Sequence, residues 1–164
     1  MLGYTLPKIE TPYWGTYENF RKIVLVDVDG TLADSSHRIH YLRENPKNWD
    51  SFFDEKIVFE DPPIRAVADL VRAIRPFYVI VIATGRPERL RSVTTEWLVR
   101  YKIEFDVMLM REDDDRIDDD VLKIRMAEVF PLDRIAFAIE DRNRIVKAYR
   151  EKGIVTLQPR DGNF

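Results

Sequence analysis

The stretch Lys22-Ile23-Val24-Leu25-Val26-Asp27-Val28-Asp29-Gly30-Thr31-Leu32 decides the fold that we expect for this chain. Residues 23–26 are an unbroken apolar run, mostly β-branched, which is typical of a strand buried on both faces of a parallel sheet. The run stops at Asp27 and Asp29, which are costly to bury and should therefore lie at the exposed end of the strand. In open α/β sheets, ligands bind at that end.

Two carboxylates spaced two residues apart can reach a common site where a strand opens into a loop. One of them can attack an electrophile as a nucleophile, and the other can move protons as a general acid and base. Gly30 permits a sharp turn because it tolerates a positive φ. The alternative is an acidic turn after a strand, so the catalytic interpretation depends on what other segments bring to this point.

The D-V-D-G-T-L sequence at 27–32 resembles the first motif of the haloacid dehalogenase-like (HAD) phosphohydrolases. In that family the first Asp is phosphorylated and the second protonates the leaving oxygen. The resemblance therefore implies that Asp27 is the nucleophile and Asp29 the acid/base. An Asp at position 29 favours a phosphatase over a dehalogenase, which lacks this proton donor.

The composition is that of one soluble globular domain, with 164 residues, 45% hydrophobic and 34% charged. No apolar run reaches membrane-spanning length and the start does not resemble a signal peptide, so we expect a cytoplasmic protein with no membrane contact. The absence of cysteine excludes disulfides and thiolate metal sites. A net charge of -3 is no signature of a strong nucleic-acid binder, although a local basic patch could exist.

The segments on either side of the first strand lack a clear period. Residues 1–20 contain five aromatic side chains and predict an irregular arm that packs on the domain or contacts a partner. The domain itself is expected over residues 21–164. Residues 34–62 form an insert where HAD proteins carry a cap over the site, and its small size predicts an open site. Arg38 of the insert can fork onto phosphate oxygens, or it is a solvated surface residue.

A helix and a second strand follow the insert. Asp61-Pro62-Pro63 predicts a helix start, with Asp61 as the N-cap, and apolar residues recur at helical spacing over residues 64–74. Residues 77–83 predict a second buried strand, which ends at Thr84-Gly85-Arg86.

The T-G-R sequence at 84–86 can bind phosphate. A hydroxyl followed by glycine at a strand end can hydrogen-bond a phosphate oxygen, and Arg86 can add positive charge. Alone, the sequence would be an ordinary junction between a strand and a helix. Its position after the second strand matches the second motif of the resembled family.

A run of carboxylates over residues 111–120 follows the third predicted strand, residues 105–110. Such runs are usually solvated loops, and this one lacks the spacing of a calcium loop. Asp118 can cap the next helix. Lys123 is unfavourable for the dipole of that helix, which favours a role in neutralising a phosphate, with a surface lysine as the alternative.

The fourth predicted strand, residues 135–139, ends at Glu140-Asp141. If this strand runs parallel beside the first, Asp27 and Asp141 converge, and each raises the pKa of the other unless a cation separates them. Oxygen ligands without histidine or cysteine point to magnesium. The alternative is that the acidic pair caps the following helix. A fifth strand is predicted at residues 154–157, followed by a polar tail.

Strands that alternate with helices predict an α/β fold with parallel pairing and right-handed crossovers. The resemblance implies a Rossmann-like, three-layer HAD sandwich with a five-stranded parallel sheet of order 3-2-1-4-5 and a small cap insert after the first strand.

The second half of the chain narrows the resemblance. R-E-D-D-D-R-I-D-D-D-V-L-K at 111–123, A-I-E-D-R at 138–142 and the final D-G-N-F are similar to the phosphatase domain of phage polynucleotide kinases. That domain removes 3′-phosphates from nucleic-acid ends and nucleotides with magnesium. The likeness runs from about Ile23 to the C-terminus. This chain departs from that domain in that it has Ile117 in place of a basic residue, Glu140 in place of Asp, and a different insert at residues 34–62. It also has no kinase half, so we expect at most a free-standing phosphatase.

Carried over by position, this resemblance implies a complete set of site residues. The catalytic residues are Asp27, Asp29 and Lys123. The phosphate-binding residues are Thr84, Gly85, Arg86, Arg38 and Asp119, with Asp119 also expected to hold Lys123. The magnesium ligands are Asp27, the backbone carbonyl of Asp29, Asp141 and, as a weaker ligand, Glu140.

The expected function is therefore a magnesium-dependent phosphomonoesterase that works through an aspartyl-phosphate on 3′-phosphorylated nucleic-acid ends or nucleotides. Two alternatives stay open. One is a phosphatase of small molecules such as 5′-nucleotides, and the other is a non-catalytic binding module that uses the aromatic arm and the acidic loop.

Overall fold

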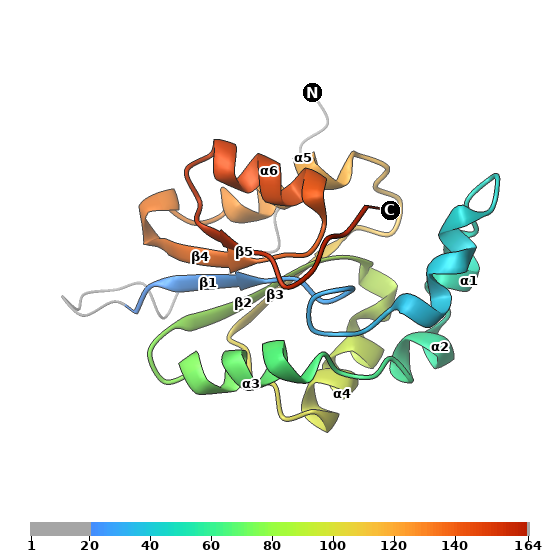
Figure 1. Cartoon of the computed structure of the whole chain (residues 1–164), viewed down its shortest axis with the longest axis horizontal. Helices are drawn as coiled ribbons and strands as arrows, with labels where there is room; N and C mark the ends of the chain where they lie inside the picture. The colour runs from blue at the N-terminus through green and yellow to red at the C-terminus, as the bar shows by residue number, and fades with distance from the viewer. Residues whose placement is uncertain (1–20, 164) are drawn as a thin grey trace.

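The computed structural model describes residues 21–163; the predicted aromatic arm, residues 1–20, lies outside the described residues. Five strands form one parallel sheet of order β3-β2-β1-β4-β5, which confirms the predicted order (Figure 1). The strands are β1 (Ile23–Val26), β2 (Val79–Pro87), β3 (Val107–Arg111), β4 (Ile135–Ile139) and β5 (Thr156–Leu157).

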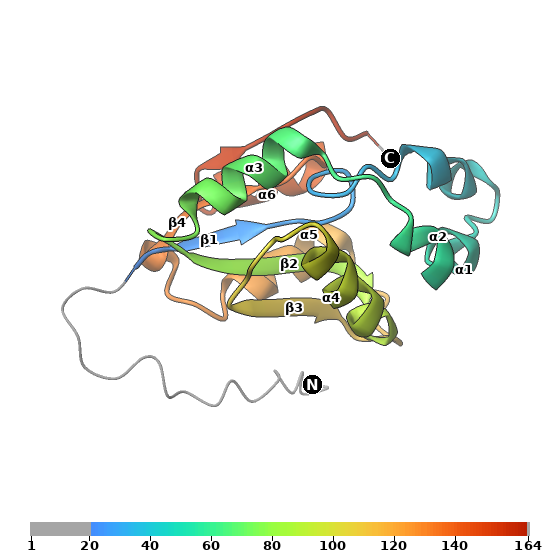
Figure 2. The same cartoon turned by 90° about the horizontal axis from the view of Figure 1, so that it is seen from below.

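Helices cover both faces of the sheet and complete the three layers. Helices α3 (Arg65–Ile74) and α4 (Arg91–Arg100) lie on one face, and α5 (Asp119–Ala127) and α6 (Asn143–Glu151) lie on the other (Figures 1 and 2). The side chains of β1 alternate between the two apolar cores: residues 24 and 26 join the core under α3 and α4, and residues 23 and 25 join the core under α5 and α6. This explains why the β1 sequence is apolar at every position.

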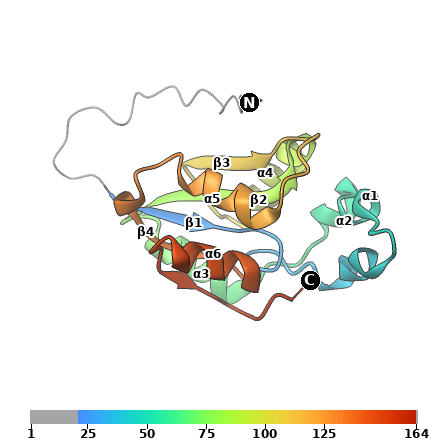
Figure 3. The same cartoon turned by 90° about the horizontal axis from the view of Figure 1, so that it is seen from above.

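The insert stands beyond the carboxyl end of β1, at the predicted place between the first strand and the first long helix (Figure 3). It contains the 3₁₀ helix η1 (Ser36–Arg43) and the short helices α1 (Trp49–Phe52) and α2 (Glu55–Phe59). Two further 3₁₀ turns are η2 (Glu88–Leu90) and η3 (Leu132–Arg134). Among the described residues, no helix has both the length and the apolar character needed to cross a membrane.

Some element ends differ from the predicted ones. β2 continues past Ala83 to Pro87, because Pro87 pairs with Arg111 of β3 after a register shift, so Thr84-Gly85-Arg86 belongs to the strand rather than to a loop. β5 is only two residues long, since its pairing with β4 is confined to residues 156 and 157. Gly153 ends α6 with a φ of +79°, as expected of a C-terminal glycine.

Candidate active site

The predicted acidic residues meet at the carboxyl ends of β1 and β4, which are parallel neighbours. Asp27 directly follows β1, and Glu140 and Asp141 directly follow β4. Each offers a carboxylate oxygen to one cluster in which these oxygens lie within 4.8 Å of one another, and all three residues are buried. Residues more than a hundred positions apart in the sequence are thus brought together by the sheet topology.

Lys123 of α5 reaches into this cluster from the neighbouring helix layer. Its Nζ donates hydrogen bonds to Asp27 Oδ1 at 2.6 Å, to Glu140 Oε2 at 2.7 Å and to the Ala83 carbonyl at 2.7 Å. Burial lowers the pKa of Lys123, but Asp27 and Glu140 outweigh it and raise the pKa above its usual value. The ammonium group therefore stays charged, and its three donors all have acceptors.

Asp119, the first residue of α5, lines a cavity at the site. It was expected to hold Lys123, but it does not. Its carboxylate accepts hydrogen bonds from Arg111 and Arg142 instead. Burial raises the pKa of Asp119, and Arg142 and Arg111 more than offset this, so the net pKa is lowered. Asp118 occupies the N-cap position of α5, but its side chain makes no capping hydrogen bond and instead forms an ion pair with Arg144.

The carboxylates of Asp27 and Asp141 are buried close together, and the pKa of each is raised. Burial and then Glu140 raise the pKa of Asp27 to about 7, and burial and then Asp27 raise the pKa of Asp141 to about 7. Asp141 Oδ2 is buried without a hydrogen-bond partner among residues 21–163, although Arg160 Nε stands 3.9 Å away. An all-carboxylate donor set with an orphaned buried oxygen fits a hard divalent cation such as magnesium.

The Asp141 carboxylate occupies the space that a side chain at Gly30 would fill. Gly30 has a φ of +88°, and a Cβ at this position would lie 2.1 Å from Asp141 Oδ2. Gly162, near the C-terminus, is similarly close, because a Cβ there would lie 2.8 Å from both the backbone carbonyl and Oδ2 of Asp141. The Gly162 amide and Gln158 Nε2 donate to that carbonyl at 2.9 and 2.8 Å. Gln158 and Gly162 of the predicted polar tail thus pack against Asp141. The only signal for this in the sequence was the D-G-N-F resemblance.

The Asp29 carboxylate turns away from the acidic cluster toward two arginines. Arg86 donates from Nη2 to Oδ1 at 2.7 Å and from Nε to both oxygens at 3.0 and 3.1 Å, and Arg38 Nη2 also donates to Oδ1. Burial raises the pKa of Asp29, but Arg86 and Arg38 outweigh it and hold the pKa well below its usual range. Oδ1 takes three of these four hydrogen bonds, which leaves Oδ2 with more capacity to hold a proton.

Asp61 is a site residue that sequence reasoning missed. Its predicted role as a helix cap is wrong, because α3 begins at Arg65 with Ile64 at the N-cap position. Asp61 is instead fully buried, and its carboxylate accepts hydrogen bonds from Arg38 at 2.6 and 2.9 Å and from Arg86 at 3.0 Å. An Asp-Pro-Pro sequence is typical of a helix start, so nothing local indicated a buried ion pair.

The T-G-R sequence at 84–86 lies beside these groups. Thr84 is buried, and its Oγ1 accepts a hydrogen bond from the Arg86 amide at 3.2 Å. Gly85 lines a cavity of about 1100 Å³ that has Asp27 and Asp29 among its lining residues. The same cavity is lined by Trp49, Phe52 and Phe53 of the insert and by the acidic segment 113–119.

Comparisons with known proteins show the family and the fold of this chain. The family model of the polynucleotide kinase (PNKP) phosphatase domain matches residues 21–164. A chain of the Pnkp1/Rnl/Hen1 complex matches all of this chain with 24% identity and a TM-score of 0.74. A chain of the Pnkp1/Rnl/Hen1 RNA repair complex matches 96% of it with 23% identity and the same TM-score. This chain spans only 58% and 48% of those two chains.

A more distant match has a similar fold. It is the putative HAD-hydrolase YfnB from Bacillus subtilis, solved bound to magnesium, with 13% identity, a TM-score of 0.62 and coverage of 87% of this chain and 94% of that one.

Proposed function

The chain belongs to the PNKP phosphatase family of HAD-type phosphatases, and from this premise we propose that it is a magnesium-dependent phosphomonoesterase that works through an aspartyl-phosphate. The observation that carries the proposal is the buried cluster in which Lys123 holds one oxygen of Asp27 while Asp141 stands within reach of the same point. A nucleophilic carboxylate needs this fixed orientation and a nearby positive charge to approach a phosphate.

Asp27 and Asp29 divide the chemistry between them. Lys123 binds Oδ1 of Asp27, so the other oxygen attacks phosphorus. The bond from phosphorus to the leaving oxygen breaks, and that oxygen takes a proton from Asp29. Water then attacks the aspartyl-phosphate, Asp29 takes a proton from the water, and the bond to Asp27 breaks to release phosphate. An incoming phosphate raises the pKa of Asp29, because nearby negative charge disfavours the ionised carboxylate.

The remaining residues bind the phosphate and the metal. Thr84 and Gly85 would hold phosphoryl oxygens, and Lys123, whose three donors stay on Asp27, Glu140 and the Ala83 carbonyl, would supply positive charge beside the phosphate. Asp119 would orient Arg111 and Arg142 on the cavity wall. Asp27, Asp141 and the backbone carbonyl of Asp29 would hold Mg²⁺, with Glu140 as a weaker ligand because Lys123 already occupies one of its oxygens. When bound, Mg²⁺ screens the charge of the phosphate from the attacking carboxylate.

The proposed substrate is a 3′-phosphorylated nucleic-acid end or nucleotide. The family and the fold shared with a chain of an RNA repair complex support this substrate class. The exposed ring of Trp49 on the cavity wall, with Lys47 Nζ 5.6 Å from its centre, offers a surface for a base.

We also propose that residues 21–164 form the phosphatase domain and that residues 34–62 form its cap.

The acidic segment 113–119 on the same wall favours a second candidate, a phosphatase of small molecules such as 5′-nucleotides. The exposed carboxylates of Asp113 and Asp114 oppose the approach of a polyanion at this wall, while Lys47, Arg89 and Arg144 line the same cavity and attract a phosphate. The two candidates share their phosphoryl chemistry and differ in the leaving group.

Phosphate release separates the candidates. The substrates are a 3′-phosphorylated oligonucleotide, a 3′-mononucleotide, a 5′-mononucleotide and 4-nitrophenyl phosphate, each with Mg²⁺ and with a chelator. We expect release only with the metal, faster release from 3′ than from 5′ esters, and no release by Asp27→Asn, which keeps the shape of the side chain but not its charge. Equal or faster turnover of the 5′-mononucleotide would favour the small-molecule phosphatase. No release from any ester under any metal would favour a binding module.

A further inference from the structure

We propose that Asp61 is a positioning residue for the acid/base Asp29, because it joins Arg38 and Arg86 into one clamp on that carboxylate. The proposal rests on the proposed role of Asp29. Asp61 lies 32 residues beyond Asp29 in the sequence, at the end of the insert, and does not touch the reacting atoms itself.

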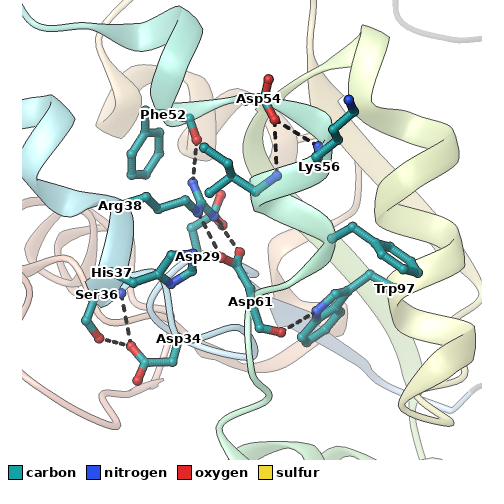
Figure 4. A network of polar contacts seen from close by, with 12 residues as sticks. Asp29, Asp34, Ser36, His37, Arg38, Phe52, Asp54, Lys56, Asp61 and Trp97 are labelled. Atoms are coloured by element: carbon teal, nitrogen blue, oxygen red, sulfur yellow. Dashed lines mark hydrogen bonds and ion pairs between the residues drawn. The ribbon is translucent and has the colours of Figure 1, made fainter.

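The clamp is a four-membered charge cluster in the interior. Arg38, Arg86 and Asp61 are fully buried, and the Asp29 side chain is 15% exposed. Figure 4 shows Arg38 between the carboxylates of Asp29 and Asp61. Two guanidinium groups face two carboxylates, so the cluster is neutral when both carboxylates are ionised. Removing one partner of such a buried set leaves a charge without compensation.

The donor groups of the arginines show why the clamp needs Asp61. Arg38 uses Nε and Nη2 on Asp61, Nη2 also on Asp29, and Nη1 on the Phe52 carbonyl at 2.9 Å. Arg86 Nη2 is shared between Asp29 and Asp61. Without the Asp61 carboxylate, Arg38 keeps Asp29 as its single side-chain acceptor, and the two guanidinium groups lose the second carboxylate that they share. The orientation of Asp29 that depends on them is then lost.

Asp61 is itself fixed from three sides, which suits it to this role. Trp97 Nε1 of α4 donates to its backbone carbonyl at 2.8 Å, and its own amide donates to the Val58 carbonyl of α2 at 3.3 Å. His37 Nε2 of η1 lies 3.5 Å from its carboxylate. The insert and α4 therefore meet at this residue, and both fix the carboxylate that binds Arg38 and Arg86.

Two esters of similar shape test the proposal, because they differ in their need for a general acid. Benzyl phosphate has a poor leaving group and 4-nitrophenyl phosphate a good one, and kcat/KM reports the step in which the leaving oxygen is protonated. We expect Asp61→Asn to lower kcat/KM for benzyl phosphate at least about tenfold more than for 4-nitrophenyl phosphate, since general acid catalysis contributes about 100-fold or more. The ratio of the two values in one preparation does not depend on the folded fraction.

Two further variants keep the test decisive. Asp106→Asn removes a carboxylate that binds Arg75 and the Ile80 amide at the opposite, amino-terminal end of β2, and we expect an unchanged ratio. Trp97→Phe removes the hydrogen bond to the Asp61 carbonyl and should shift the ratio in the same direction by less; it carries the test if Asp61→Asn does not fold. Equal losses for both esters would overturn the proposal and leave Asp61 a structural residue. An inactive wild-type chain would instead refute the proposed function.

Discussion

At the scale of single residues, Gly30 is the position where the backbone decides whether the site can form. Because a Cβ there would lie 2.1 Å from Asp141 Oδ2, we expect Gly30→Ala to displace that carboxylate. A shift of about 1 Å in a catalytic group can cost about 100-fold in rate, so we expect a loss of this order in magnesium-dependent phosphate release.

Gly153 provides the matched control for this prediction. It has a similar φ of +79°, but a Cβ at this position meets nothing within 4 Å. Gly153→Ala should therefore cost only the left-handed backbone strain, about 1–2 kcal/mol in the free energy of unfolding, and keep its activity. Denaturant unfolding and phosphate release measure the two effects. If the two variants are equally active, Gly30 is not needed to make room for Asp141.

Residues that directly follow an apolar strand were predictable, and the buried network behind them was not. Asp27 and the Glu140-Asp141 pair each follow such a run, and parallel strands end at one edge, so their convergence could be inferred. The arginines could be named as site residues, but the sequence could not indicate that Asp29 and Asp61 occupy them. Long-range ion pairs leave no local period or spacing, and the helix-start sequence at Asp61 pointed to a different role.

At the scale of elements, the insert controls what can bind beside the phosphate. Trp49 of α1 is 41% exposed and stacks on Phe53 at 5.8 Å between ring centres, while Phe52 is tied to Arg38 through its carbonyl. Trp49 lines the cavity, and its edge-on contact with the Phe52 ring, 6.0 Å between ring centres, connects it to the Arg38 site. Base stacking on such a ring is worth about 1–3 kcal/mol, so we expect Trp49→Ala to raise KM for a 3′-phosphorylated oligonucleotide roughly tenfold.

An oligonucleotide whose terminal nucleoside lacks its base provides the control substrate for Trp49. We expect KM for this substrate to be the same in Trp49→Ala and in the wild type, because it has no base to stack. Phe77→Ala removes an aromatic ring that is 70% exposed just before β2 and should change neither KM. A rise in KM that is equal with and without the terminal base would show that Trp49 supports the fold of the insert rather than the base.

At the scale of the whole molecule, the strand order imposes an electrostatic cost on folding that a bound metal ion would remove. With β1 beside β4, folding buries Asp141 against Asp27, which raises the pKa of Asp141 to about 7 by burial and then by the Asp27 charge. A carboxyl group with a raised pKa supports folding fully below its ordinary pKa of 3.8, and this support is lost as the pH rises to about 7. At pH 8 without metal, we therefore expect Asp141→Asn to unfold at an equal or higher temperature than the wild type.

Magnesium should reverse that order. A ligand that binds only the folded chain adds about 2.7 kcal/mol at a concentration of 100 times its Kd, which corresponds to roughly 5–10 °C in Tm for a domain of this size. We expect this rise in the wild type and not in Asp141→Asn, so the wild type should unfold at the higher temperature when Mg²⁺ is added. Thermal unfolding at pH 8 with a chelator and with saturating Mg²⁺ measures both. If Mg²⁺ stabilises the two proteins equally, the ion binds elsewhere, and the convergence of Asp27 and Asp141 serves some purpose other than holding it.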